Sequence, residues 1–328
     1  MIAIVLRIAV ACVVLAFAAA ASAQVPASVP SPASAPATAF KAPLATKAPL
    51  LGVVRAGSRL VAVGDYGVIL LSDDDGKTWR QAKSVATRAM LTAVTMSDAQ
   101  QGWAVGHGGT VLQTIDGGET WTRNHLAGND VALLSVWFAD ANHGIAAGAF
   151  GFATATHDGG RTWKEFAVGI GDDRDRHLNA IFALPDGPLF IAAEAGTLFR
   201  SGDDGRTWET LRLPYKGSLW GGMALRDGTA IVFGMRGHAL RTADQGRSWT
   251  DVPTGTDQSW SGGRQFGDGT IVLVGLGGAV AKSADGGHSF QATIRPERQT
   301  LAAVAEGARG QPIIVGLNGI AASPPAAK

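Results

Sequence analysis

The sequence predicts an all-β protein, a seven-bladed β-propeller made of four-stranded antiparallel blades. Glycine accounts for 44 of the 328 residues, a share about twice the usual 7% or so. Charged residues make up only 17% of the chain, against a usual share of about 25%. One short motif recurs six times, and two apolar runs precede each copy. This turn-rich, apolar composition excludes collagen, a coiled coil and a largely disordered chain.

The first 23 residues have the pattern of a secretory signal peptide. Arg7 precedes an apolar run at 8–21, and the small residues Ala21, Ser22 and Ala23 follow it. A membrane anchor is the alternative, but this run falls short of the roughly 20 apolar residues that a spanning helix needs. We expect cleavage after Ala23 and an exported, periplasmic protein without direct membrane insertion.

Cleavage would also change the composition of the mature chain. It removes Arg7 and Cys12, so the 28 basic residues become 27, equal to the 27 acidic ones, and no cysteine remains. Packing alone must then stabilise the domain, since no disulfide can form. Zero net charge gives no general attraction to nucleic acid or anionic lipid. We expect a Pro/Ala-rich tether at 24–37, the propeller at 38–323 and a short tail at 324–328.

The recurring motif is S/T-x-D-x-G-x-S/T-W/F. Its last residues are 42, 42, 45, 41 and 41 positions apart. The six copies are SDDDGKTW (72–79), TIDGGETW (114–121), THDGGRTW (156–163), SGDDGRTW (201–208), TADQGRSW (242–249) and SADGGHSF (283–290).

Each type of side chain that recurs in the six copies suits a tight turn between two strands. The carboxylate can accept backbone N–H groups of the turn, and the glycine two places later allows a positive φ. The terminal aromatic opens the next strand, and we expect it in the core, as we do Trp137, Trp220 and Trp260 on innermost strands. The structural aspartates are Asp74, Asp116, Asp158, Asp203, Asp244 and Asp285.

Two apolar runs joined by a G/A/E-x-x-G turn precede each motif, so each repeat supplies four strands. Residues 301–304, 312–319 and 320–323 supply three strands of a seventh unit, with no Asp turn after them. We expect the segment at 39–44 to pair beside these strands and close the ring, which would remove the free sheet edges.

These motifs are Asp-box, or BNR, repeats, and their combination with short glycine-rich blades resembles the photosystem II stability and assembly factor family. The resemblance covers about residues 38–323. It implies a non-enzymatic propeller that binds membrane-protein subunits during assembly, without cofactor or metal. We therefore expect a protein-binding scaffold for an envelope or membrane protein complex, acting as a monomer.

A glycan-binding protein or sialidase-like glycoside hydrolase is the alternative, because sialidases also carry Asp boxes. A sialidase needs an arginine cluster and a tyrosine nucleophile paired with a glutamate, whereas this chain has only Tyr66 and Tyr215 and lacks an F/Y-R-I-P motif. The seven histidines lack metal-ligand spacing, and His157 and His288 fall inside Asp turns. Residues 172–176 alternate in charge, which is typical of a solvated loop. We expect no catalytic residue.

In a propeller, the turns between the second and third strands share one face with the connections between blades, and the Asp boxes lie on the other face. The turn residues form the candidate binding ring: Asp65, Tyr66, His107, Phe150, Glu194, Arg236, Leu276 and Asn318. The connections add a basic set that favours an acidic partner surface: Lys83, Arg88, Arg123, His125, Arg174, Arg176, His177, Tyr215, Lys216, Arg295 and Arg298.

Overall fold

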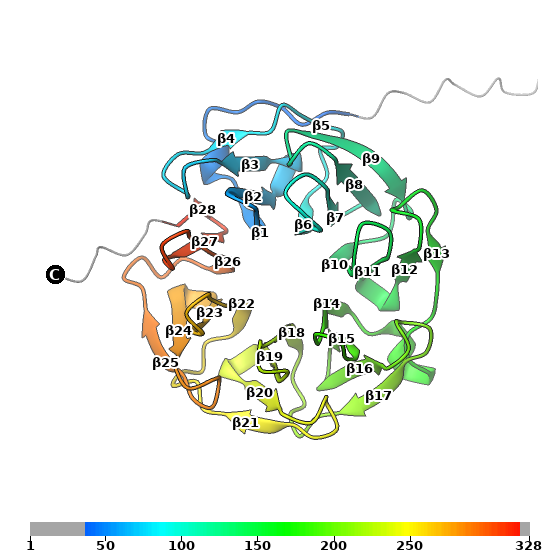
Figure 1. Ribbon diagram of the computed structural model, residues 1–328, viewed down its shortest axis with the longest axis vertical. Helices are drawn as coiled ribbons and strands as arrows, with labels where there is room; N and C mark the ends of the chain where they lie inside the picture. Colours follow the sequence, from blue (N-terminus) through cyan, green and yellow to red (C-terminus); the bar gives the residue numbers. More distant parts are fainter. Residues whose placement is uncertain (1–36, 322–328) are drawn as a thin grey trace, which may run out of the picture. The chain divides into compact units, whose positions relative to one another are not determined.

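Seven β-sheets stand around a central opening (Figure 1). The computed structural model describes residues 37–321. The expected signal peptide, tether residues 24–36 and the tail at 324–328 lie outside the described residues. The seven-bladed propeller predicted from the repeats is confirmed.

The strands of each blade are antiparallel and follow one another in chain order from the inside outward. The exception is an extra short strand, β5, which pairs in parallel with β9 at the outer edge of the second blade. The blades are β1 Leu50–Ala56, β2 Arg59–Gly64, β3 Ile69–Ser72, β4 Arg80–Gln81; β5 Ser84–Val85, β6 Leu91–Met96, β7 Gly102–Gly106, β8 Thr110–Thr114, β9 Thr120–Leu126; β10 Leu133–Phe138, β11 Gly144–Gly148, β12 Ala153–Thr156, β13 Lys164–Glu165; β14 Leu178–Ala183, β15 Leu189–Ala193, β16 Thr197–Ser201, β17 Glu209–Arg212; β18 Leu219–Ala224, β19 Ala230–Gly234, β20 Ala239–Thr242, β21 Thr250–Val252; β22 Trp260–Gln265, β23 Ile271–Gly275, β24 Ala279–Ser283, β25 Gln291–Ile294; and β26 Leu301–Glu306, β27 Pro312–Gly316, β28 Gly319–Ile320.

The only helical segments in residues 37–321 are short 3-10 turns. Four of them occupy the turn between the second and third strands of a blade, and the others precede the first and fourth blades. They are η1 Ala45–Lys47, η2 Asp65–Gly67, η3 Ala149–Gly151, η4 Gly171–Asp175, η5 Met235–Gly237 and η6 Leu276–Gly278.

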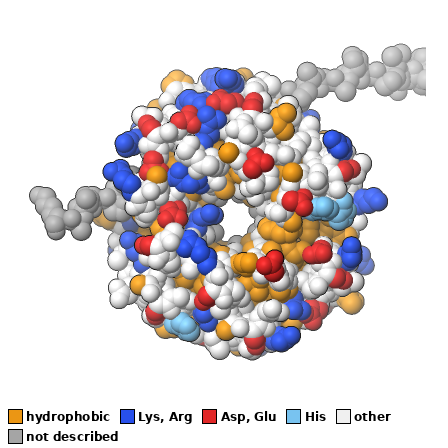
Figure 2. Space-filling view, viewed as in Figure 1, with side chains coloured by type: hydrophobic (Ala, Val, Ile, Leu, Met, Phe, Trp, Pro, Cys, Tyr) orange, Lys and Arg blue, Asp and Glu red, His pale blue; other side chains and the backbone are white. Residues whose placement is uncertain are grey.

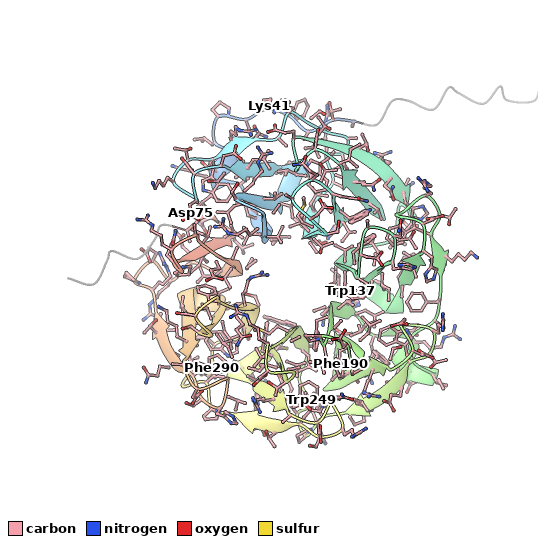
Figure 3. All side chains as sticks on the ribbon, in the orientation of Figure 1. Lys41, Asp75, Trp137, Phe190, Trp249 and Phe290 are labelled. Carbon is pink, nitrogen blue, oxygen red and sulfur yellow. The ribbon has the colours of Figure 1, made fainter. Side chains whose placement is uncertain are left out.

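The core lies between neighbouring blades, where apolar side chains of adjacent sheets meet. Phe190 of the fourth blade meets Trp249 of the fifth edge to face, with ring centroids 5.9 Å apart (Figure 3). Trp121 and Phe290 are buried, as expected of the aromatics that end the motifs. The other four, Trp79, Trp163, Trp208 and Trp249, are half-buried and pack against the buried clusters. Of the innermost-strand tryptophans, Trp260 is buried, and Trp137 and Trp220 are half-buried.

The prediction that residues 39–44 form a closing strand beside the seventh blade is wrong. The seventh sheet has only the strands β26, β27 and β28. The N-terminal segment lies instead along the outer edges of the first and second blades. Gln81 Nε2, in β4 of the first blade, donates to the Phe40 carbonyl at 3.0 Å, and the Ala39 amide donates to the Val85 carbonyl, in β5 of the second blade, at 2.9 Å. The Arg88 guanidinium covers the Phe40 ring at 3.8 Å. These partners hold the segment where the first two blades meet, and η1 follows it beside β28.

The ring closes instead through direct packing of β1 on β26. Leu50 and Ala62 of the first blade share a buried cluster with Val315 of the seventh. Asp75, in the first Asp box, adds hydrogen bonds to the seventh blade at the same junction (Figure 3). The ring therefore closes without a strand shared between the two ends of the chain.

Candidate functional site

The two faces of the propeller carry different connections, as the sequence predicts. The turns between second and third strands contact the connections that lead to the next blade. A Cβ at Gly67 would lie 2.4 Å from the Thr87 carbonyl oxygen, and one at Gly237 would lie 1.9 Å from that of Thr256. We call this side the turn face, and the side with the Asp boxes the box face.

The six Asp boxes share one hydrogen-bond pattern. In the fourth box, the Asp203 carboxylate accepts the Thr207 amide at 2.8 Å through Oδ1 and the Thr207 hydroxyl at 2.6 Å through Oδ2. Ser201 donates to Asp203 Oδ1 at 2.8 Å, and its own hydroxyl oxygen accepts the Gly205 amide at 2.8 Å. Gly205 has a φ of 84°, as its place in the motif predicts.

These hydrogen bonds keep the box aspartates ionised. The side-chain and backbone hydrogen bonds from Thr207 lower the pKa of Asp203 to about 2. Equivalent donors, led by the hydroxyl at the seventh motif position, lower the pKa of Asp74, Asp158 and Asp244 to about 2. All four carboxylates are thus committed to their turns and are poor proton donors at neutral pH.

The turn face presents large side chains on a strained backbone. Tyr66, Phe150 and Arg236 stand at the tips of their turns with φ between 53° and 54°, in the left-handed region. Tyr66 is 69% exposed and Phe150 is 74% exposed. Bulky residues rarely adopt this conformation, and residues that do so often belong to binding sites.

Phe150 belongs to a small network at the junction of the third and fourth blades. Its amide donates to His177 Nδ1 at 3.0 Å, and the two rings meet edge to face with centroids 4.8 Å apart. The His177 amide in turn donates to Glu194 at 3.0 Å. A cavity of about 620 Å³ lies beside Phe150 and is also lined by Arg174. The structure therefore brings together four of the predicted binding residues at this junction.

Four exposed cations of the turn face have no ion-pair partner among residues 37–321: Arg174, Lys216, Arg236 and Arg298. The box face carries both kinds of arginine. Arg59 bonds Asp73 at 2.5 Å and Arg241 lies 3.4 Å from Asp227, whereas Arg161 and Arg247 form no ion pair within residues 37–321. The four unpaired cations of the turn face are charges that a partner can contact directly.

Two predicted binding residues belong to the fold instead. Arg176 donates to Asp173 at 2.7 Å, and Arg212 donates to both carboxylate oxygens at 2.7 Å. Burial alone would raise the pKa of Asp173, but the hydrogen bonds of the two arginines outweigh it and lower that pKa. Residues 172–176 are thus not a simple solvated loop, because Asp173 is only 7% exposed.

Tyr215 is the second such residue. It is 9% exposed, its hydroxyl donates to the Met235 carbonyl at 3.0 Å, and its ring stacks on His238. Burial raises the pKa of this phenol. Tyr215 supports the turn beneath Arg236 and is not available to a partner.

The remaining predicted residues are spread around the ring. His107 and Asn318 are exposed at the turns of the second and seventh blades. Asp65 is half-buried and accepts the Tyr66 amide at 2.7 Å, so it stabilises the turn that presents Tyr66. The candidate residues therefore form a discontinuous ring of contacts and not a single pocket.

Sequence reasoning missed one feature, a hydrophobic groove on the box face between the third and fourth blades. Figure 2 shows hydrophobic side chains gathered beside the central opening over β10–β18, with histidines at the rim of the same blades. The signal in the sequence is Ala155, a small residue at a repeat position that elsewhere holds a long side chain.

Residues 37–321 contain no group of three His, Cys, Asp or Glu side chains arranged to hold a metal ion. No helix in this part of the chain has the length and hydrophobicity needed to cross a bilayer.

Comparison with solved structures shows the same fold in proteins of low sequence identity. A structure of YCF48 bound to a D1 peptide is 19% identical, with a TM-score of 0.67 over 87% of this chain and 94% of that chain. YCF48 from Cyanidioschyzon merolae is 15% identical, with a TM-score of 0.66 over 86% and 96%. A streptogramin B lyase is 14% identical, with a TM-score of 0.72 over 86% and 94%. These similarities establish the propeller fold alone.

The family assignment rests on the sequence. Comparison with curated proteins gave no match. The sequence profile of the photosynthesis system II assembly factor YCF48 matches residues 128–319, which is more than half of the chain. The repeats, the seven blades and this match agree, and the chain belongs to the YCF48 family of photosynthesis system II assembly factors.

Proposed function

We propose that the protein is an exported, non-enzymatic scaffold that binds a membrane or envelope protein during its assembly. Membership of the YCF48 family supports an assembly role, and one solved member of similar fold is bound to a peptide. The signal-peptide pattern of residues 1–23 supports a periplasmic location and a partner in the envelope. We further propose that the protein acts as a monomer.

The observation that carries this proposal is the chemistry of the turn face. Tyr66 and Phe150 are held in solvent on left-handed backbone, although smaller residues occupy the same tips in the second, fourth and sixth blades. Aromatic and arginine side chains dominate the energetics of protein interfaces. Exposed aromatics beside unpaired cations therefore favour a protein partner with an acidic, partly apolar surface.

A non-enzymatic role agrees with the state of the box aspartates. Their carboxylates accept three or four hydrogen bonds each within their own turns, and their lowered pKa excludes them as general acids at neutral pH. Of the two tyrosines that a sialidase-like mechanism could use, Tyr215 is buried and bonded to Met235.

The test is a charge reversal with a matched control. One variant changes the four unpaired cations of the turn face, Arg174, Lys216, Arg236 and Arg298, to Glu. The control changes four exposed cations elsewhere, Lys77, Arg161, Arg247 and Arg309, to Glu. Each protein is tagged and used to capture partners from detergent-solubilised envelope membranes, which mass spectrometry then identifies.

We expect the control to retain the membrane protein captured by the wild type and the turn-face variant to lose most of it. Circular dichroism checks that both variants fold. Equal capture by the two variants would overturn the placement of the site. Hydrolysis of a glycoside panel by the wild type would overturn the non-enzymatic role.

A further inference from the structure

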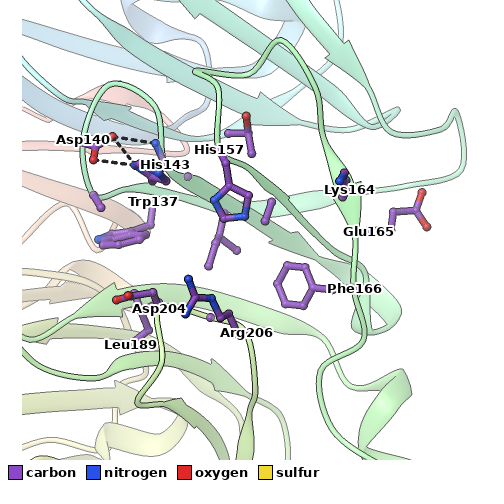
Figure 4. A pocket seen from close by; sticks show the side chains of 16 residues that line it. Trp137, Asp140, His143, His157, Lys164, Glu165, Phe166, Leu189, Asp204 and Arg206 are labelled. Atoms are coloured by element: carbon purple, nitrogen blue, oxygen red, sulfur yellow. Dashed lines mark hydrogen bonds and ion pairs between the residues drawn. The ribbon is translucent and has the colours of Figure 1, made fainter.

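A cavity of about 500 Å³ opens on the box face between the third and fourth blades. Trp137, Phe166 and Leu189 form part of its apolar lining (Figure 4), together with Ile145 and Ala155. The turn of the fourth Asp box, at 204–206, and polar side chains of the third blade, among them two histidines, also line it. We call this cavity the interblade groove. Its size and its mostly apolar lining are typical of ligand sites.

Comparison of the repeats explains why the groove is open. The residue before the first Ser or Thr of each Asp box is long in five blades and short in one. In the third blade it is Ala155, whereas the others have Leu71, Gln113, Arg200, Arg241 and Lys282. Strand register confirms the equivalence, since Ala155 pairs with Ile145 as Arg200 pairs with Phe190. The third blade therefore lacks the long side chain that the other five blades have at this position.

Three of these long side chains cross to the next blade and donate a hydrogen bond to one particular carbonyl. Arg200 Nε donates to the Gln245 carbonyl at 2.9 Å, and Arg241 Nε donates to that of Gly286 at 3.0 Å. Gln113 Nε2 donates to the Gly159 carbonyl at 3.3 Å. Each acceptor is the fourth residue of the next Asp box.

In the second Asp box, the same carbonyl accepts a hydrogen bond although the residue at the donor position of the first blade is apolar. Leu71 cannot donate, and Arg59 Nη1 instead reaches the Gly117 carbonyl at 3.0 Å. In the fourth box the corresponding residue is Asp204, and no donor from the described part of the third blade bonds its carbonyl. The groove thus has the shape and the acceptor of an arginine site but lacks the arginine.

The charges at the groove also suit a cation. Asp204 and Glu165 are exposed at its mouth, and neither forms an ion pair within residues 37–321. Asp140 is engaged by His143, at 2.8 Å. Lys164 and Arg206 also line the groove, so its three carboxylates exceed its two permanent cations by one. An aromatic wall that includes Trp137 and Phe166 can further hold a guanidinium and its methylene stem.

We propose that the interblade groove is a receptor site for an arginine side chain of a partner protein. The stem lies between Trp137 and Phe166, and the guanidinium donates to the Asp204 carbonyl, as Arg200 does to that of Gln245. This site lies on the face opposite the turn face. It is therefore a second contact, beyond the proposed function, and it is tested independently of that function.

The test titrates the full chain with acetyl-Gly-Arg-Gly-amide while NMR follows the indole N–H signal of Trp137. Matched peptides replace Arg with citrulline, which is neutral, or with norleucine, which keeps only an apolar stem. We expect saturable shifts with the arginine peptide and affinities about tenfold lower or worse with the other two. Equal binding of the norleucine peptide, or tighter binding of a phenylalanine peptide, would overturn the proposal.

The decisive variant fills the groove from within. Ala155→Arg copies the fourth and fifth blades, so it should fold with equal or higher stability and weaken binding of the arginine peptide at least tenfold. Ala155→Leu copies the first blade and gives a second filled form, and Ala155→Ser is the control that leaves the groove open. Undiminished binding by both filled forms would refute the site. Capture of the turn-face partner should be unchanged in all three, which separates this proposal from the proposed function.

Discussion

Asp75 Oδ2 accepts a hydrogen bond from Gln311 Nε2 at 2.5 Å, across 236 positions of sequence. The same carboxylate accepts the Ala308 amide at 2.6 Å and bonds Arg55 at 2.5 Å through Oδ1. Burial alone would raise the pKa of Asp75, but the donors from Ala308, Gln311 and Arg55 outweigh it and lower that pKa. One carboxylate thus links the first blade to the seventh at the one junction that no chain connection spans.

We expect Asp75→Ala to lower the free energy of unfolding by about 1–3 kcal/mol, because it removes the ionised carboxylate that accepts hydrogen bonds from Ala308, Gln311 and Arg55. The matched control is Asp204→Ala, at the same motif position and with a similar positive φ of 58° against 65°. Any strain of alanine in this backbone is therefore common to both variants. Urea unfolding measures the difference, and equal losses in the two variants would show that the Asp75 contacts do not stabilise the closure.

Stability should fall steeply in acid. Four of the box aspartates, Asp74, Asp158, Asp203 and Asp244, have a pKa of about 2 in the folded chain, against a reference value of 3.8, and the pKa of the other two is also lowered. Because the folded value is the lower one, their contribution is complete above about pH 4 and is lost as the pH falls through about 2. Melting temperatures measured from pH 6 to pH 2 should fall mainly between pH 4 and 2. Asp203→Asn should melt lower at pH 6 and show a shallower fall, and an unchanged slope would contradict this origin of the acid sensitivity.

Arg174 and Arg176 should have separable roles although they are close in sequence. Arg176→Ala removes a partner of the buried Asp173 carboxylate and should cost about 1–3 kcal/mol of stability, with capture by the folded fraction retained. Arg174→Ala should leave stability within about 0.5 kcal/mol and reduce partner capture. Thermal melts and capture assays on both variants check this, and the reverse pattern would refute the division.

The tip residues of the turn face should be dispensable for folding. Gly108 and Gly277 already occupy the equivalent positions in the second and sixth blades, with φ of 63° and 61°. Tyr66→Gly should therefore retain the stability of the wild type or exceed it by up to about 1 kcal/mol. Its partner capture should nevertheless fall. A loss of stability above about 1 kcal/mol would mean that Tyr66 serves the fold.

Much of the fold could be predicted because the residues of each Asp box determine the turn that they form. The carboxylate, glycine and hydroxyl of the motif act within eight residues, so their hydrogen bonds depend little on the rest of the chain. The constant spacing then predicted the blades. The exposed tips at Tyr66 and Phe150 and the assignment of the two faces followed from the same regularity.

The features that could not be predicted from the sequence depend on contacts between distant segments. The position of residues 39–44 was decided by Val85 and Arg88, and no local pattern distinguishes that edge from the one beside β28. The roles of Tyr215 and of Arg176 depend on Met235 and Asp173, which only the folded chain brings near. The groove beside Ala155 is a missing side chain, and it becomes visible only when the blades are compared with one another.

The most direct test of the central claim, that a protein partner docks on the turn face, is site-specific photo-cross-linking. A photoreactive phenylalanine analogue is placed at Phe150 on the turn face in one protein and at Lys77 on the box face in the other. Each is expressed with its leader and irradiated in intact cells. The account predicts a discrete adduct with the captured membrane protein from position 150 and none from position 77. The same adduct from position 77, with none from position 150, would contradict it.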